Sequence, residues 1–187
     1  MNTPTSQSFQ YSVYNPAYPR ELEAVFHRAE SDEDVLSQLL PALGYLLKCD
    51  YCLLYLRHPD CDRSKVTHYW EKHYHPRVVE DSWHREDTCL LSRSWLFNAA
   101  LSAEHSVFID DVDVDYKELL SSDPLLRGER ALVQGHIIKN NQLWGVLRVG
   151  VFDRPRSWKQ FDRSLIIHSV QRLVPHAISY VQAMAPS

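Results

Sequence analysis

One stretch decides how the rest of the chain is arranged: residues 139–158, K-N-N-Q-L-W-G-V-L-R-V-G-V-F-D-R-P-R-S-W. Asn140 and Asn141 both tolerate the positive φ angles of a two-residue type I′ turn, so they predict a β-hairpin. The strand after the turn is apolar on both faces, which is typical of a central strand that is covered on both sides. Its simple alternation places Leu143, Leu147, Val149 and Val151 on one face, and Trp144, Val146, Arg148 and Phe152 on the other.

The segments on either side of this stretch extend the hairpin and close the fold. Residues 129–139 are expected to form the partner strand. Ser157 and Gln160 fit a capping box at the start of a last helix, whose apolar stripe continues almost to the end of the chain. Pro175 lies within that helix and removes one backbone hydrogen bond.

The N-terminal half predicts helices followed by a second hairpin. Residues 1–18 are polar and lack a period, so we expect a loose leader before a single domain at 19–187. Helices are expected at 20–30 and at 31–48, where Ser31 is the N-cap. Further along, the pattern predicts strands at 51–57 and 66–75, an exposed loop at 76–87, a helix at 88–103, a strand at 106–112 and short turns at 116–120 and 124–126. This order indicates an α+β domain with an antiparallel sheet covered by helices.

Composition excludes several classes of function. The chain has 187 residues, 44% of them hydrophobic, and a net charge of -4, so it lacks the basic surface of a nucleic-acid-binding protein. Its apolar runs are shorter than the roughly 20 residues that a membrane span needs. The N-terminus lacks the pattern of a signal peptide, so we expect a cytoplasmic protein whose four cysteines are thiols.

Two groups of side chains could bind a metal ion. Cys49, Cys52, His58 and Cys61 offer four ligands that suit zinc, but the two cysteines of C-x-x-C border a buried strand, where packing is the simpler interpretation. Four histidines, His68, His73, His75 and His84, crowd the second hairpin and its loop. No carboxylate or cysteine stands at a matched spacing, so a solvated edge is the simpler interpretation there.

Acidic residues gather at the end of the strand predicted at 106–112: Asp110, Asp111, Asp113 and Asp115. They lack the central glycine and distal glutamate of a calcium loop. Capping of the turns that follow is the favoured interpretation, and acceptance of ligand N–H groups is the functional alternative. The sequence contains no G-x-S-x-G, phosphate-binding loop or dinucleotide fingerprint, so no catalytic residue is predicted.

Several motifs in the C-terminal half resemble the GAF domains of cyanobacteriochromes and phytochromes. The matching pieces are Ile109-Asp110-Asp111-Val112, Lys117-Glu118-Leu119-Leu120, Leu143-Trp144-Gly145-Val146-Leu147, Pro155-Arg156-Ser157-Trp158 and Ala177-Ile178. The resemblance implies a sheet of five to six antiparallel strands with helices on both faces, and N- and C-terminal helices that pack together.

The chain departs from that pattern where those photoreceptors handle their chromophore. A Cys-His pair, which attaches and contacts the bilin in the family pattern, is replaced here by Asp115 and Tyr116. A second family histidine, six residues after the tryptophan of Trp-Gly, is replaced by Gly150. Neither a carboxylate nor a phenol forms the thioether, so covalent bilin attachment is not expected.

The resemblance leaves two hypotheses of function and a weaker third. The first is a non-enzymatic regulatory domain without cofactor that acts on an unidentified protein partner and forms a homodimer through its terminal helices. The second is a sensor that binds a tetrapyrrole or another small molecule noncovalently. Its expected ligand-binding residues are Trp95, Asp111, Asp115, Tyr116, His136, Arg148 and Gly150. The third is reduction of methionine sulfoxide, known in some GAF proteins, whose cysteine arrangement this chain does not reproduce.

Overall fold

A six-stranded antiparallel sheet forms the centre of the computed structural model, which describes residues 18–73, 79–102 and 106–185. The predicted leader therefore lies almost wholly outside the described residues. The strands are β1 (Tyr51–His58), β2 (Arg63–Glu71), β3 (His84–Arg85), β4 (Val107–Ile109), β5 (Ala131–Lys139) and β6 (Gln142–Val151), in the spatial order β3-β2-β1-β6-β5-β4. The segment at 139–158 thus supplies the central strand, as predicted.

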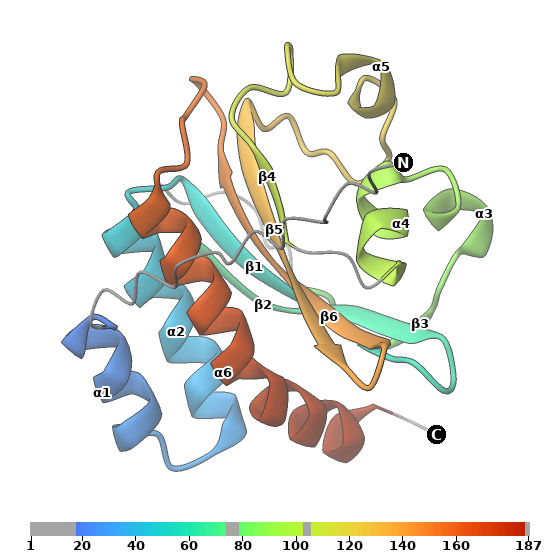
Figure 1. Cartoon of the computed structure of the whole chain (residues 1–187). Helices are drawn as coiled ribbons and strands as arrows, with labels where there is room; N and C mark the ends of the chain where they lie inside the picture. Colours follow the sequence, from blue (N-terminus) through green and yellow to red (C-terminus); the bar gives the residue numbers. More distant parts are fainter. Residues whose placement is uncertain (1–17, 74–78, 103–105, 186–187) are drawn as a thin grey trace, which may run out of the picture.

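Helices cover both faces of this sheet, which confirms the predicted α+β architecture. They are α1 (Arg20–Arg28), α2 (Asp32–Leu47), α3 (Thr88–Leu91), α4 (Trp95–Leu101), α5 (Lys117–Leu120) and α6 (Gln160–Met184). The three long helices α1, α2 and α6 lie together on one face, and the short helices α3 and α4 lie across the other (Figure 1). The terminal helices also pack together, because Arg172 on α6 forms an ion pair of 2.6 Å with Glu23 on α1.

The hairpin between β5 and β6 has the expected turn but an unexpected register. Asn140 and Asn141 have φ angles of 52° and 59°, as a type I′ turn requires. The pairing then shifts, so that Ile138 lies opposite Leu143 while Ile137 lies opposite Gly145. Trp144 is the extra residue of this β-bulge, and a bulge changes which face the neighbouring side chains occupy.

The predicted faces of β6 are therefore wrong at its start. Leu143 packs in the same cluster as Val146. Trp144 instead joins Leu147, Val149 and Val151 in the main core beneath the long helices. Simple alternation holds only beyond the bulge.

The helix predicted at 88–103 is in fact two short helices. Ser94 interrupts it, because its hydroxyl accepts a hydrogen bond of 3.0 Å from the Phe97 N–H and so caps α4. The same hydroxyl donates to Asp123 at 2.8 Å, and Asp123 also accepts the Leu96 N–H at 3.0 Å. A distant carboxylate thus fixes where α4 begins, which local periodicity could not show. In the same half, the loop predicted at 76–87 contains the short strand β3.

The predicted capping box of the last helix is also wrong. The cap residue is Lys159, whose N–H donates to Asp162 at 3.2 Å. Trp158 lies almost wholly buried just before it, and its indole N–H donates to the Ile109 carbonyl at 2.9 Å. Anchoring of Trp158 keeps the chain extended past Ser157, so the helix starts later. From there α6 continues through Pro175 to Met184.

Candidate functional site: a cavity between the sheet and α4

A cavity of about 330 Å³ lies between the sheet and α4. Strands β1, β2, β5 and β6 form its floor, α4 forms one wall, and the segment between α5 and β5 forms another. Its lining residues are Leu53, Tyr55, Val66, Glu80, Phe97, Ala100, Pro124, Leu125, Arg127, Gln134, Val146 and Arg148. Its volume falls at the small end of the range of ligand pockets, which is roughly 300–1,000 Å³.

Arg148 is the buried cation in this cavity, with only 6% of its side chain exposed. Its Nη2 donates to the Gln134 side-chain oxygen at 2.7 Å, and its Nη1 donates to the Leu125 carbonyl oxygen. Its Nε has no hydrogen-bond partner among the residues that the structure describes. A buried N–H without a partner costs free energy, so the guanidinium is not fully satisfied in this arrangement.

Gln134 connects the floor of the cavity to α4. Its Nε2 donates to the Leu96 carbonyl at 2.7 Å and lies 3.2 Å from the Nε2 of His136. Gln134 and His136 are both buried on the same face of β5. The amide thus holds the guanidinium of Arg148 with its oxygen and the first turn of α4 with its nitrogen, which sets the distance between sheet and helix.

Glu129 is the buried anion beside Arg148, with its side chain fully buried and 4.0 Å between Oε1 and the Arg148 Nη1. It accepts a hydrogen bond from the Tyr51 hydroxyl, and its second oxygen accepts one from the Arg127 backbone N–H at 2.5 Å. Burial, reinforced by the Glu129 carboxylate, raises the pKa of Tyr51 well above its usual value. Tyr51 is therefore a neutral donor at physiological pH.

Tyr51 occupies the space next to Gly150. A Cβ at Gly150 would lie only 2.2 Å from the Tyr51 ring, so any larger residue there would displace the ring. Phe152 and Tyr69 stack on Tyr51 with ring centroids 5.3 and 5.9 Å away, and the Arg127 guanidinium lies over the rings of Tyr51 and Tyr69. The space at Gly150 is therefore filled by aromatic side chains.

A buried ion pair anchors the segment before α3 near the lining residue Tyr55. Arg57 donates two hydrogen bonds to Glu86, at 2.7 and 2.8 Å, and each side chain is less than 10% exposed. The Tyr55 hydroxyl also donates to Glu86 at 3.2 Å. These bonds hold the 84–87 segment against β1.

The seven residues predicted to bind a ligand fall into two groups. Arg148 lines the cavity, His136 contacts the Gln134 side chain, and Gly150 lies beneath Tyr51. Trp95, Asp111, Asp115 and Tyr116 do not line it. The structure thus brings three of the predicted residues close to the cavity, and ligand binding by any of the seven stays a prediction.

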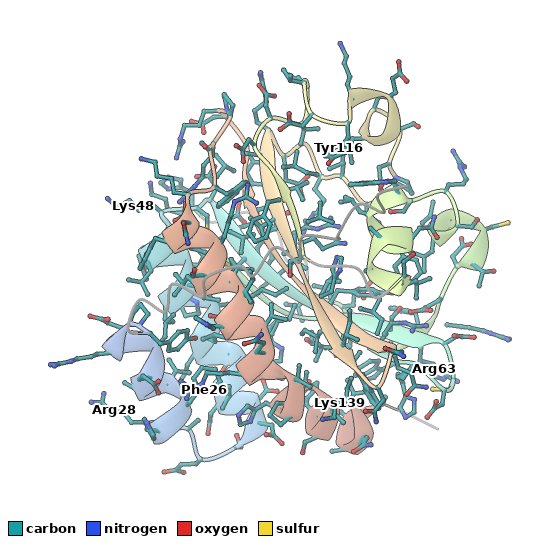
Figure 2. All side chains as sticks on the ribbon, viewed as in Figure 1. Phe26, Arg28, Lys48, Arg63, Tyr116 and Lys139 are labelled. Atoms are coloured by element: carbon teal, nitrogen blue, oxygen red, sulfur yellow. The ribbon has the colours of Figure 1, made fainter. Side chains whose placement is uncertain are left out.

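The four predicted residues that do not line the cavity instead contact one another or their neighbours in the loop before α5. Trp95 stacks on Tyr116 at 4.9 Å, and Tyr116 lies 55% exposed in the left-handed region with φ 54°. Figure 2 shows Tyr116 beside α5, above the sheet in that view. Asp111 makes two hydrogen bonds to Arg130, at 2.6 and 2.9 Å, and Asp115 accepts the N–H groups of Asp110 and Asp111. The predicted capping of the following turns holds for Asp111, which accepts the Asp113 N–H at 3.0 Å, but Tyr116, the residue before α5, provides no side-chain cap.

Sequence reasoning missed Tyr51, Glu129, Gln134 and Arg127. One signal was present for Gln134: it alternates with His136 on a strand whose other residues are mostly apolar. Polar residues at alternate positions of a buried strand indicate a shared polar environment. Tyr51 and Glu129 carry no such local signal, because their contact joins residues 78 positions apart.

The cysteines lie away from the cavity. Cys49 and Cys52 are buried in the core under the long helices, with 3.5 Å between their sulfur atoms, and Cys61 and Cys89 lie in a turn and on α3. Burial raises the pKa of the Cys52 thiol well above its usual value. Over the described ranges, no three His, Cys, Asp or Glu side chains are grouped so that they could hold a metal ion. His75 lies outside these ranges, and His73 lies beyond the end of β2.

Comparison with solved structures identifies the fold as that of GAF domains. The GAF domain of an Acinetobacter phosphoenolpyruvate-protein phosphotransferase matches with a TM-score of 0.67 and 16% identity, over 89% of this chain and 93% of that one. GAF3 of Slr1393 from Synechocystis, in its photoproduct state, matches with a TM-score of 0.60 and 22% identity, over 82% and 95%. A far-red absorbing dark state with bound biliverdin IXα matches with a TM-score of 0.63 and 15% identity, over 87% and 99%.

Sequence comparison adds no closer relationship. No family model matches the chain, and no curated protein matches it either. Among the described helices, none is long and apolar enough to cross a membrane. The fold is therefore the level at which the chain is related to known proteins.

Proposed function

We propose that this chain is a non-enzymatic sensory domain that binds a small molecule noncovalently in the cavity between the sheet and α4. The cavity beside the buried Arg148 guanidinium carries this proposal, because a concave site with a few convergent polar groups is where small molecules usually bind. The apolar walls from Leu53, Phe97 and Val146 supply the rest of a typical binding site.

Noncovalent binding is supported by the position of the thiols. No cysteine is among the cavity lining, and Asp115 and Tyr116 occupy the place of the Cys-His pair in the bilin-attachment pattern. A solved structure with this fold holds biliverdin IXα, so a noncovalent tetrapyrrole is the obvious larger candidate. Use of the space at Gly150 by such a ligand would require the Tyr51 ring to move away. Titration with biliverdin, followed by visible absorbance, tests binding directly.

Two neighbouring alanines on α4 give a matched test of the cavity. Ala100 lines it, whereas Ala99 is also buried, with 6% exposed, but lies outside its lining. The purified protein is screened by thermal shift against a small-molecule set, and any molecule released from protein isolated from its own cells is added to that set. We expect ligands that raise the Tm of the wild type to lose their effect in Ala100→Val and keep it in Ala99→Val. Equal responses in both variants, or no stabilising ligand at all, would contradict the proposal.

A second role, contact with a protein partner, is favoured by apolar side chains exposed on the long helices. Phe161 and Ile167 on α6 are 45% and 41% exposed, and Tyr45 on α2 is 71% exposed. We propose that a homodimer forms through this surface and transmits ligand occupancy. Light scattering after size exclusion should give a dimer mass that Ile167→Asp reduces to that of the monomer, while Gln182→Asp on the same helix does not. A monomer over the whole concentration range would exclude the homodimer.

A further inference from the structure

The exposure of the lining residues shows where the cavity opens, and the ligand class that follows from it rests on the proposed function. Among the lining residues that the structure describes, Arg127 is the one that is exposed, and the others are buried or half-buried. The next residue, Gly128, has no neighbouring atom within 4 Å of the place where a Cβ would stand. Arg127 therefore lies at the mouth of the cavity, where water reaches its side chain.

Two aromatic rings and a backbone bond position Arg127 at this mouth. Its Cζ lies 5.8 Å from the centre of the Tyr51 ring and 5.6 Å from that of the Tyr69 ring. Its backbone N–H donates to Glu129, which fixes the start of the side chain. A cation–π contact offers no lone pair, so it leaves the guanidinium N–H groups to bond water or the acid group of a ligand.

The two arginines of the lining differ in how their charge is compensated. Arg148 is buried, and the Glu129 carboxylate lies 4.0 Å away, so these two charges offset each other. By contrast, no ion pair or side-chain hydrogen bond joins the Arg127 guanidinium to another residue in the described part of the chain. A ligand anion at the mouth would therefore meet a cation and keep contact with water, which avoids most of the cost of burying its charge.

One carboxylate in the lining limits where a ligand anion can lie. Glu80 is half-buried, and its Oε2 accepts the Val66 N–H at 2.7 Å. It would repel a second anion on the β2 side of the cavity, and it would oppose a ligand with more than one negative charge. The anionic group should therefore carry a single charge and lie at Arg127, while the mainly apolar walls surround the body of the ligand.

We infer that the cavity binds a compact monocarboxylate. Its apolar body fills the space between the sheet and α4, and its acid group lies at the mouth beside Arg127. The volume of about 330 Å³ suits a small aromatic or branched aliphatic acid. An ion pair that is partly open to water is modest in strength, so the acid should bind about fivefold more tightly than a neutral molecule of the same shape.

An isosteric charge series tests which ligand charge the cavity prefers. Benzoate, benzamide and benzamidine share one shape and carry a negative charge, no charge and a positive charge. A naphthalene set and a cyclohexane set repeat the series at other sizes. NMR titrations should show the tightest binding for the acid and the weakest for the amidine, with about fivefold between acid and amide. Because the ion pair is open to water, high salt should reduce that difference.

Matched variants test the position of the acid group. Arg127→Gln removes the cation and should remove the difference between acid and amide, whereas Arg127→Lys should keep most of it. Glu80→Gln removes the repulsion and should raise the affinity for the acid about twofold. Arg154→Gln changes an exposed arginine outside the lining and should leave the series as in the wild type. All variants are first compared with the wild type by thermal melting and by their NMR spectra.

The outcomes distinguish this inference from the proposed function. If probes bind but the amide or the amidine equals the acid, the carboxylate inference is wrong and the cavity still binds small molecules. A preference for the acid that persists in Arg127→Gln and at high salt would also overturn the inference, because the acid group would then lie elsewhere.

The wider ligand screen decides the case in which no probe binds. Neutral or cationic ligands from that screen would overturn the carboxylate inference alone, and a screen without any ligand would overturn the proposed function as well. An acid preference that Arg127→Gln removes and Arg127→Lys retains would support both.

Discussion

The two faces of the central strands differ sharply, although the same strands form both. Toward α2 and α6, strands β1, β5 and β6 present mainly apolar side chains, such as Leu54, Val133 and Leu147. His58 lies beside Trp144 of this core. Toward α4 they present Gln134, His136 and Arg148, all buried. The first face is covered by helices of 16 and 25 residues, the second by helices of four and seven residues with intervening loops. Long helices bury a continuous apolar core, whereas the short ones leave a cavity with polar contacts.

We call the face toward α2 and α6 the helix face and the face toward α4 the cavity face. The comparison indicates that the helix face contributes most of the stability, whereas the polar groups of the cavity face can select what the cavity binds. Buried polar groups cost free energy unless they are satisfied, so they remain where they have a use. On the cavity face, substitutions that break an ion pair should therefore lower stability strongly. Substitutions of side chains that only line the cavity should lower it little.

Breaking the buried ion pair on the cavity face should have the largest effect. Glu86→Ala removes the buried carboxylate from Arg57 and leaves its guanidinium only the exposed Asp62 carboxylate and the Leu143 carbonyl, each at 3.3 Å. We expect a loss of about 3 kcal/mol in the free energy of unfolding, at the low end of the range for broken buried pairs. Urea denaturation measures it. The exposed pair of Asp153 and Arg154 serves as the control, since Asp153→Ala should change stability by less than about 1 kcal/mol. Similar losses in both variants would show that burial of the ion pair does not determine its contribution to the free energy of unfolding.

Adding a side chain at Gly150 should overpack the cavity face. Gly150→Ala forces the Tyr51 ring to shift and should cost about 1–3 kcal/mol. In Tyr51→Leu the ring is absent, so adding Gly150→Ala to that background should cost less than it does in the wild type. A double-mutant cycle on urea midpoints gives the coupling free energy. Strict additivity would mean that the ring and the glycine are not in contact.

Two valines on β6 compare the faces with the same chemical change. Val149 lies in the core under the long helices, and Val146 lines the cavity. Truncation to alanine should cost about 2 kcal/mol at Val149, where a new void forms, and about 1 kcal/mol at Val146, where open space already exists. Thermal and urea unfolding of both variants measure the difference. A larger cost at Val146 would reverse the assignment of the two faces.

The smallest expected effect is a change of stability with pH that comes from His68, which packs against the long helices. His68 is buried against Tyr180 of α6, and burial lowers its pKa although the Glu33 carboxylate opposes the shift. The unfolded pKa is about 6.5, so below that pH the unfolded state binds more protons. Stability should therefore fall as the pH drops from about 7 through 6.5 toward the folded pKa. Urea midpoints at pH 7.5 and 5.5 should differ less in His68→Gln than in the wild type, whereas the exposed His84→Gln should behave as the wild type.

Local signals in the sequence predicted much of this fold. The Asn140-Asn141 turn, the Ser31 cap and the strand at 51–57 follow from backbone preferences and periodicity, and the structure confirms them. The errors occurred where a distant residue decided the local outcome. Asp123 sets the start of α4, and Trp158, bonded to Ile109, delays the start of α6.

Contacts between distant residues limited the prediction of the candidate site even more than that of the fold. Arg148 and His136 could be selected because polar side chains stand out on apolar strands. Tyr51 and Glu129 could not, since neither the phenol-to-carboxylate contact nor the filled space at Gly150 leaves a local pattern.

The sequence by itself determined the type of fold and the central strand, because turn chemistry and hydrophobic periodicity act over a few residues. Only the tertiary structure decided which face carries the cavity, that Tyr51 fills the space at Gly150, and that Arg148 is buried beside Glu129. These properties depend on side chains that meet across strands and loops, and packing, charge compensation and hydrogen-bond satisfaction are settled only when the chain has folded.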